Sequence, residues 1–374
     1  MSENLTPGPP PRSSLILATL LSYFVLYGPQ TILPVLEEAF GVGRSAAALL
    51  ISATLFPLAF VPFVGGFLIE GLDLRRILRL SLGFMGLACL AIPFCPFNIV
   101  VLLRLAQGLA LALSLLSITT LSSRSGFNTG EYVATTILGG FIGRIFSEAT
   151  ASSFGWLSYF VILGAALLVT SLLPLGRAQE SRKNGGRLSL RIRESFGGSK
   201  AIVYVLTFTL FFIFMSTLNS LPYQVRLRFN LQGQVNSIFY VGYVLGLVLT
   251  LKSPALVRWI GNRERALLLG GLVFVASGIA SMAPSIYVFF GSVALLSGSM
   301  FFLHTQLLGF ISGASENRAS ANGLYLFFYY SGGVLGSYLP LRAYEVWSWA
   351  GYNCTLLSVL ASFLFFLILH LKSK

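Results

Sequence analysis

Long stretches of the chain are rich in apolar residues and carry no charged side chain. Charge is absent from residues 13–36, 45–69, 149–176, 201–225 and 266–315. A helix that spans a bilayer needs about 20 mainly apolar residues, so each of the first four stretches can hold one span and the last can hold two. The pattern therefore predicts a polytopic membrane protein.

Extended over the whole chain, the same pattern predicts an all-α membrane protein with twelve transmembrane helices. The expected spans lie near 14–36, 46–69, 76–95, 97–121, 132–154, 156–176, 201–222, 235–254, 264–283, 285–307, 319–341 and 351–371. The first span is too long for the core of a signal peptide, and the polar, proline-rich head "MSENLTPGPPPR" is typical of a disordered tail. We therefore expect the N-terminus to be retained.

Composition and charge agree with this class of protein. The chain of 374 residues is 55% hydrophobic and 10% charged, with a mean hydropathy of +0.81, whereas soluble domains are about 25% charged. With the N-terminus inside, 19 of the 25 lysines and arginines fall in inner segments, which predicts an inner-membrane protein with both termini in the cytoplasm. The net charge of +13 is dispersed over loops without a nucleic-acid-binding motif, so no nucleic-acid partner is expected.

The residue types that support catalysis or metal binding are sparse and scattered. Cys89, Cys95 and Cys354 lie in or beside apolar spans without the spacing of a metal site or a disulfide framework. Of the two histidines, His370 lies near the C-terminal tail, and His304 is interpreted as a packed residue rather than a proton carrier. No set of nucleophile, base and orienting group can be assembled. The sequence thus predicts neither an enzyme nor a protein with a cofactor or metal.

A basic, glycine-containing segment divides the chain in the middle. Residues 177–200, "RAQESRKNGGRLSLRIRESFGGSK", interrupt the apolar pattern and read as a cytoplasmic linker near anionic headgroups. The expected organisation is a tail at 1–13, a six-helix bundle at 14–176, the linker, a second six-helix bundle at 201–371 and a tail at 372–374.

The two halves repeat one another. The pair Leu33-Pro34 recurs 188 residues later as Leu221-Pro222, and Pro96 recurs as Pro284 at the same offset. Further along the offset becomes 193, where "GGFIG" at 139–143 matches "GGVLG" at 332–336. Two similar six-span bundles that move around a central site are the architecture of many secondary transporters.

Two motifs carry a resemblance to a known family. The segment "GFLIEGLDLRRIL" resembles the loop signature between spans 2 and 3 of the major facilitator superfamily, and "RLAQG" at 104–108 is similar to the motif of span 4 in that family. Glu70 stands where the family has aspartate, and Asp73 and Leu74 replace its glycine and arginine. The resemblance implies a gating loop, although a plain positive inner loop is the alternative. Its residues are Gly66, Glu70, Asp73, Arg75 and Arg76.

Within that superfamily, several segments are similar to the branch labelled arabinose-efflux-permease-like, next to the drug:proton antiporters. They are "YGPQTILPVLEEAFGV", "GGFIGR", "NSLPYQVRL" and "LYLFFYYSGG". The resemblance implies alternating access and proton-coupled export of a small organic compound, drug or sugar-like. The expected partners are that compound, protons and the lipid bilayer, with the protein as a monomer.

Repeated glycines in spans 5 and 11 predict close helix packing, because small residues four apart let two backbones approach. We expect these glycines to lie along the surface on which the halves move. They are Gly139, Gly140, Gly143, Gly332, Gly333 and Gly336.

Three charges within the spans are the candidate coupling or binding site. The repeat places Ser292, Ser337 and Leu341 where the first half has Arg104, Arg144 and Glu148, so the scaffold does not require these charges. A charge at mid-membrane costs about 2.5–3.5 kcal/mol on insertion scales, and such residues are commonly functional. Purely structural pairing is the alternative.

Helix rise places Glu148 at the depth of Arg104, and one turn from Arg144, so either arginine is a possible partner. Two mechanisms follow. In one, Glu148 carries a proton and the arginines modulate its affinity for it. In the other, Arg104 and Arg144 attract an organic anion, as in a facilitator or importer, and Glu148 is their resting counter-ion. A membrane receptor or assembly protein without transport is the remote alternative. The candidate cavity residues are Tyr27, Gln30, Gln107, Asn219, Tyr240 and Tyr329.

Overall fold

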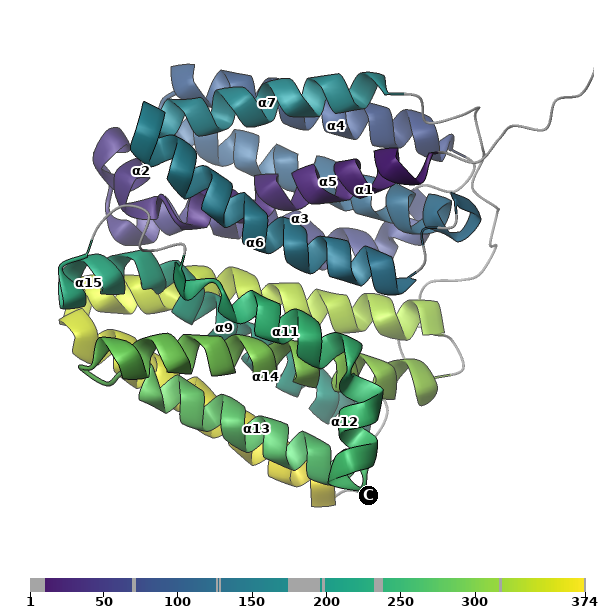
Figure 1. Cartoon of the computed structure of the whole chain (residues 1–374), viewed down its shortest axis with the longest axis vertical. Coiled ribbons are helices and arrows are strands. Elements are labelled where there is room, and N and C mark those ends of the chain that lie inside the picture. Colours follow the sequence, from purple (N-terminus) through teal and green to yellow (C-terminus); the bar gives the residue numbers. More distant parts are fainter. Residues whose placement is uncertain are drawn as a thin grey trace, which may run out of the picture.

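The computed structural model describes residues 11–68, 72–125, 127, 129–173, 196, 199–231, 238–315 and 318–372. In this part of the chain the regular structure is helical, without a β-strand. The helices form two bundles, one from each half of the sequence, which lie one above the other in Figure 1. The predicted all-α membrane fold with two pseudo-symmetric bundles is therefore confirmed.

The N-terminal bundle contains the first six predicted spans. Its elements are α1 (Arg12–Tyr27), η1 (Gly28–Gln30), α2 (Leu33–Phe40), α3 (Arg44–Leu68), α4 (Leu74–Ala91), η2 (Ile92–Phe94), α5 (Phe97–Ser125), α6 (Thr129–Phe154) and α7 (Trp156–Leu172). The first span is broken, because α1 tightens into the 3-10 turn η1 and the chain then bends by 65° into α2. Pro29 and Pro34 stand in the first turns of η1 and α2, where a helix needs no N–H donor from them.

The C-terminal bundle contains the last six predicted spans. Its elements are α9 (Ser199–Phe229), α11 (Gly242–Leu251), α12 (Ser253–Ile260), α13 (Arg263–Ala280), α14 (Ile286–Gly313) and α15 (Arg318–Lys372). Spans 11 and 12 both belong to α15, which is interrupted by non-helical backbone at Trp347 and Ser348. Ser348 has a φ of 54° and a ψ of −150°, which is incompatible with a helix, and this break separates span 11 from span 12.

Helix α12 differs from the expectation for span 8. The hydropathy pattern predicts one helix near 235–254, whereas α11 ends at Leu251 and the chain bends by 73° into α12. Pro254, in the first turn of α12, has no N–H with which to continue α11. Trp259 is exposed on α12 beside Arg258, a combination typical of the boundary between bilayer and water.

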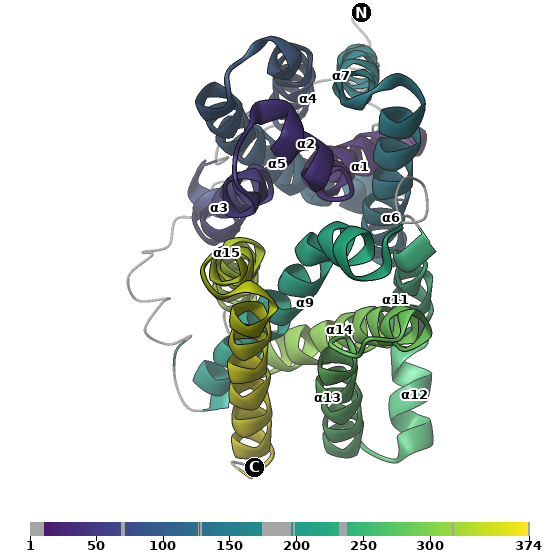
Figure 2. The same cartoon turned by 90° about the vertical axis from the view of Figure 1, so that its left-hand side faces the viewer.

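The helices run between two ends of the molecule, which we name from the chain. At the tail end lie the start of α1 and the end of α15, toward the right of Figure 1. At the far end lie α2 and the interruption of α15. Figure 2 views the far end directly and shows the two bundles meeting there through α2, α3, α9 and α15.

The repeated glycines pack equivalent helices together in each bundle. A Cβ on Gly143 would lie 2.9 Å from the Cα of Phe24 in α1, and a Cβ on Gly336 would lie 2.3 Å from the carbonyl of Phe212 in α9. Phe212 follows Phe24 by the 188-residue offset of the repeat. Gly139 and Gly332 follow the same scheme, on Leu20 and Phe208, which also differ by 188. Gly140 and Gly333 pack on aromatic rings of the same two helices, Tyr27 and Phe211.

This arrangement corrects the expectation that the glycines lie along the moving surface between the halves. All six pack against a helix of their own bundle, because α6 rests on α1 and α15 rests on α9. Gly140 also approaches the other half, with a Cβ position 3.6 Å from the ring of Tyr243. The glycines thus mainly hold each bundle together.

Some predicted features lie outside the described residues. They are Glu70 of the gating loop, residues 1–10 of the N-terminal tail, 177–195 and 197–198 of the linker, and the last two residues.

Candidate functional site

A cavity of about 440 Å³ lies between the two bundles. Its walls come from α1, α3, α5 and α6 in one bundle and from α9, α11, α14 and α15 in the other. Most of the lining residues of α3, α5, α6, α14 and α15 lie toward the tail end of their helices, as Ser122 of α5 and Leu308 of α14 illustrate. The cavity therefore faces the tail end.

Aromatic side chains from both bundles make up much of the cavity wall. The lining tyrosines are Tyr23, Tyr27, Tyr132, Tyr243, Tyr329 and Tyr330. Tyr329 stacks on Phe211 with ring centroids 3.8 Å apart. Small hydroxyl side chains add further polar groups, and the described lining residues include no aspartate, glutamate, lysine or arginine. The wall thus offers ring faces and hydroxyl groups rather than charges.

Arg144 of α6 lies directly behind this wall and is fully buried. Its Nη1 donates to the carbonyl of Gly140 at 2.7 Å, and its guanidinium lies 4.5 Å from the ring centroid of Tyr27 and 4.6 Å from that of Tyr243. Tyr240 contributes a third ring at 5.0 Å. Aromatic faces stabilise a cation, and more so when water is absent. The predicted residues Arg144, Tyr27 and Tyr240 therefore come together in one cluster.

Gln30 connects Arg144 to the opposite bundle. Its Oε1 accepts hydrogen bonds from Nε and Nη2 of Arg144, at 2.7 and 2.5 Å, and its Nε2 donates to Oδ1 of Asn219. Asn219 in turn donates to the carbonyl of Ser337 at 3.4 Å. The break at η1 places Gln30 here, because an uninterrupted α1 would point this residue elsewhere. A hydrogen-bonded chain thus crosses the molecule from α6 to α15.

The two ends of this chain are equivalent positions of the repeat. In the first half, Thr31 donates through Oγ1 to the carbonyl of Arg144 at 3.3 Å. In the second half, Asn219 donates to the carbonyl of Ser337. Asn219 follows Thr31 by 188 residues and Ser337 follows Arg144 by 193, the two offsets found in the sequence. The cluster therefore lies where the internal symmetry brings both halves together.

Arg104 and Gln107 occupy a different place, inside the N-terminal bundle. Arg104 donates to the carbonyls of Leu50 and Val25, both at 2.9 Å, and to Oε1 of Gln107 at 3.0 Å. Gln107 donates to the carbonyl of Met85 and to Sγ of Cys89, both at 3.2 Å. These contacts tie α5 to α1, α3 and α4, and neither residue lines the cavity. The hydrogen bonds of Arg104 thus go to two main-chain carbonyls and to the side-chain carbonyl of Gln107.

Glu148 lies in α6 one turn beyond Arg144 toward the far end, and it is 5% exposed. Tyr240 of the opposite bundle faces the guanidinium of Arg144 and also lies within electrostatic range of Glu148. Glu148 is therefore placed behind the Arg144 cluster as seen from the cavity. Access of water to this carboxyl group depends on how the two bundles meet.

His304 belongs to the cavity, although the sequence alone favours a packed role. Its Nδ1 lies 2.9 Å from the hydroxyl of Tyr325, and its ring centroid is 4.5 Å from that of Tyr329. It lines the wall together with Thr305 of the same helix. Neither spacing nor hydropathy could reveal this, because the cavity forms only when α14 meets the other bundle. The contact of Tyr243 with Arg144 cannot be predicted from the sequence for the same reason.

The gating-loop residues lie at the tail end. Asp73 accepts a hydrogen bond from the backbone N–H of Arg75 at 3.0 Å and so caps the start of α4. Arg75 is buried and Arg76 is exposed. Gly66 lies in the last turn of α3. Of the acidic residues predicted in the gating loop, Asp73 is thus the one that caps α4 in the described part of the chain.

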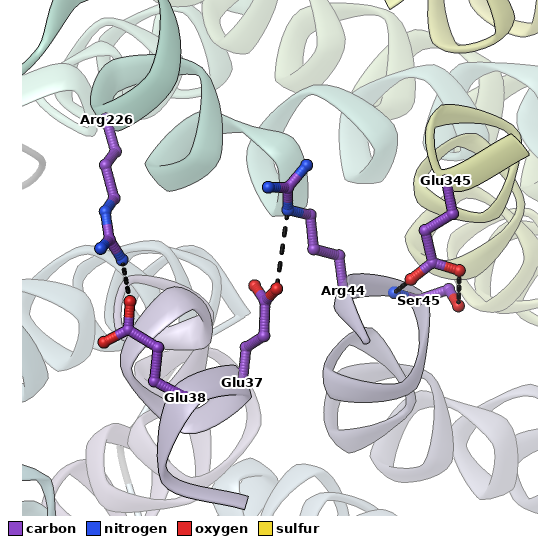
Figure 3. Close-up of polar contacts among 6 residues, drawn as sticks. All are labelled: Glu37, Glu38, Arg44, Ser45, Arg226 and Glu345. Atoms are coloured by element: carbon purple, nitrogen blue, oxygen red, sulfur yellow. Dashed lines mark hydrogen bonds and ion pairs between the residues drawn. The ribbon is translucent and has the colours of Figure 1, made fainter. Parts of the chain in front are cut away.

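The far end is closed by polar contacts between the bundles, which Figure 3 shows. Glu38 of α2 pairs with Arg226 of α9 at 2.6 Å. Glu345 of α15 accepts hydrogen bonds from the N–H and the hydroxyl of Ser45 in α3, at 2.8 and 2.6 Å. The structure therefore combines a cavity that faces the tail end with a sealed far end.

Comparison with known proteins agrees with this architecture. The sequence model that describes the Major Facilitator Superfamily matches residues 15–337 of the chain. The fold and the cavity between the bundles are therefore those of a membrane transporter. The chain belongs to the Major Facilitator Superfamily.

Similar proteins cover nearly the whole chain. An uncharacterized transporter of Buchnera aphidicola subsp. Schizaphis graminum (strain Sg) is 24% identical over 96% of this chain and 90% of its own length. The uncharacterized MFS-type transporter YybF of Bacillus subtilis (strain 168) is 25% identical over 83% of this chain and 81% of its own.

Solved structures share the fold at low identity. The nucleoside transporter NupG superposes with a TM-score of 0.79 at 14% identity, over 96% of this chain and 99% of that protein. An inward-facing, occupied bacterial homolog of the human lysosomal transporter Spinster gives a TM-score of 0.68 at 14% identity, over 97% and 95%.

Proposed function

We propose that this protein is a secondary active transporter that exports a small organic compound in exchange for protons. The observation that carries the proposal is the cavity between two pseudo-symmetric bundles, lined from both sides and sealed at the far end by contacts between the bundles. A site reached from one end at a time is what alternating access requires. The positive-inside distribution of lysine and arginine makes the tail end cytoplasmic, so the solute would be loaded from the cytoplasm.

The chemistry of the cavity favours an uncharged or weakly polar ring compound over an organic anion. A charged solute would lose its hydration in this site without meeting an opposite charge, which is costly. Neither arginine lines the cavity. Arg144 is fully buried, with its donors on Gln30 and the carbonyl of Gly140 and with aromatic rings on its faces, and Arg104 is 1% exposed inside the N-terminal bundle. This supports the drug- or sugar-like substrate of the arabinose-efflux-permease-like branch rather than the anion facilitator.

Proton coupling is proposed to act through Glu148. The carboxyl group lies one helical turn from Arg144 on the same helix, and Tyr240 of the opposite bundle faces that arginine. Movement of the bundles would change both its hydration and its distance from the arginine, and each change alters its affinity for a proton. The Arg144, Gln30 and Asn219 chain gives that movement a direct connection to the other half.

The test is flux in proteoliposomes with and without a pH gradient, over neutral ring compounds such as phenyl glycosides. We expect the gradient to drive flux in the wild type, and Glu148→Gln to abolish driven flux while exchange of substrate without a gradient persists. Glu131→Gln is the matched control, because Glu131 is a carboxylate at the exposed start of the same helix. Gradient-driven flux that survives in Glu148→Gln would contradict the role of Glu148. Wild-type flux of equal rate with and without the pH gradient would favour a facilitator. Absence of flux for every compound would favour a receptor.

A further inference from the structure

The contacts that close the far end differ in strength. The Glu38 and Arg226 side chains are 62% and 40% exposed, so their ion pair competes with water and contributes little. The side chain of Glu345 is 21% exposed and receives two hydrogen bonds from Ser45. Arg44, next to Ser45, lies over the ring of Tyr344 at 4.7 Å. The more protected contact is therefore the one between Glu345 and the start of α3.

Glu345 occupies the position of a helix cap. Arg44 is the first residue of α3, and Ala47 donates to the carbonyl of Gly43, which makes Gly43 the N-cap residue. The first N–H groups of a helix have no acceptor within it, and the N-terminus attracts negative charge. The carboxylate of Glu345 meets both demands by accepting from the N–H of Ser45.

The chain that precedes α3 offers no side chain for this role. N-caps are usually serine, threonine, aspartate or asparagine, whereas residues 41–43 here are Gly-Val-Gly. A Cβ on Gly43 would lie 2.8 Å from Oε1 of Glu345, so a larger residue would displace the carboxylate. The N-cap residue Gly43 thus has no side chain of its own to cap α3 and leaves room for a carboxylate from another helix.

That acid comes from the opposite half of the molecule. Glu345 lies 300 residues after Ser45, just before the interruption of α15 at Trp347. When the far end opens, α3 and α15 separate, and the start of α3 loses its cap. We propose that Glu345 is a latch: it caps α3 across the bundle interface only when the far end is closed, and thereby sets the ratio of the two access states. The latch acts independently of substrate and coupling ion.

Double electron–electron resonance can test the latch without a ligand. Spin labels at Phe94→Cys and Tyr287→Cys report the far end, and labels at Arg79→Cys and Arg265→Cys report the tail end. All four positions are exposed, and the three native cysteines are replaced by serine. A shift between access states lengthens the far-end distance and shortens the tail-end distance.

We expect Glu345→Gln to raise the ratio of open to closed far ends about tenfold, because the N–H and hydroxyl of Ser45 then meet a neutral acceptor in place of a carboxylate. The pair of Glu345 with Arg342 lies within α15, so its loss does not by itself favour either state. Gly43→Ala should produce a similar shift without altering any polar group. Ser45→Ala removes only the hydroxyl contact, so its expected shift is smaller, about threefold.

Glu38→Gln is the matched control, since it removes a carboxylate from the other ion pair at the same end. Its exposed pair should change the ratio by less than about threefold. The latch is wrong if Gly43→Ala and Glu345→Gln leave both distances unchanged, or if Glu38→Gln shifts them equally. Lengthening at both ends would also overturn it, because that result indicates loosening of the fold.

Discussion

At the scale of single residues, Arg144 shows how a buried cation is kept in a membrane protein. A guanidinium away from water needs its donors occupied and its charge compensated. Gln30 occupies two donors and the carbonyl of Gly140 a third, while three tyrosine rings surround the charge. This environment fits the planar fork of arginine and no other side chain.

Replacing Arg144 by lysine should therefore be damaging although the charge is kept. Lysine cannot make the forked contact with Gln30, and we expect a loss of about 1.5–3 kcal/mol in stability together with loss of flux. The melting temperature in detergent and flux in proteoliposomes measure the two effects. Arg12→Lys is the control, because Arg12 forms an exposed pair with Glu131. Equal melting temperatures and flux for the two variants would contradict this role of Arg144.

At the scale of helices, the repeat is expressed as equivalent packing in both bundles. Span 5 rests on span 1 and span 11 rests on span 7, in each case through glycines. The same pairs of helices carry the backbone contacts of Thr31 and Asn219. Close packing at these two places fixes the position of Arg144 relative to Gln30.

A methyl group at Gly336 should disturb this packing. Its Cβ would lie 2.3 Å from the carbonyl oxygen and 2.7 Å from the Cα of Phe212, and a backbone cannot move aside as a side chain can. We expect Gly336→Ala to lower stability by about 1–3 kcal/mol, seen as a lower melting temperature. Gly291→Ala is the control, because that helical position has nothing within 4 Å. If the two variants have the same melting temperature, the close contact of Gly336 with α9 does not stabilise the protein.

At the scale of the whole molecule, the two ends are in opposite states. The far end is closed by contacts of Glu38 and Glu345 with the other bundle, while the cavity faces the tail end. Among the described residues, the basic side chains at the start of α4 and around α12, such as Arg76, Arg79, Arg258 and Arg265, lie at the tail end, so the orientation of the chain decides which compartment the cavity meets.

Labelling of single cysteines checks that orientation. An impermeant maleimide should modify Arg265→Cys only in inside-out vesicles and Tyr287→Cys only in right-side-out vesicles, because positive loops stay in the cytoplasm. Both positions are exposed and lie at opposite ends of the molecule. The reverse pattern would place the termini outside and would make the cavity face the exterior.

The sequence predicted the helices well, because a run of apolar residues long enough to cross the bilayer has few other structures available. It did not predict the bend into α12, since hydropathy gives no information on the direction in which a helix continues. The internal repeat also gave the glycine pairs correctly, and the family itself was identified from Arg104–Gly108 and the loop after Gly66.

The candidate site could be predicted only in part. Charges inside spans single out Arg144, since the cost of burial makes them conspicuous, but their partners come from distant segments. Gln30 lies 114 residues from Arg144 and Ser45 lies 300 residues from Glu345. His304 and Tyr243 look like ordinary residues of apolar helices until the two bundles meet. Contacts between halves need the folded arrangement.

The paired contacts of Thr31 with Arg144 and of Asn219 with Ser337 also have a historical meaning. The offsets of 188 and 193 residues identify the two halves as two copies of one six-span unit, as an internal duplication would produce. The backbone contact survives in both copies, although both donor and acceptor residues have changed identity. At the acceptor position, the first half has the guanidinium of Arg144 and the second half has the hydroxyl of Ser337. The two halves therefore share the backbone arrangement at this site, but only the first half places a charged side chain there.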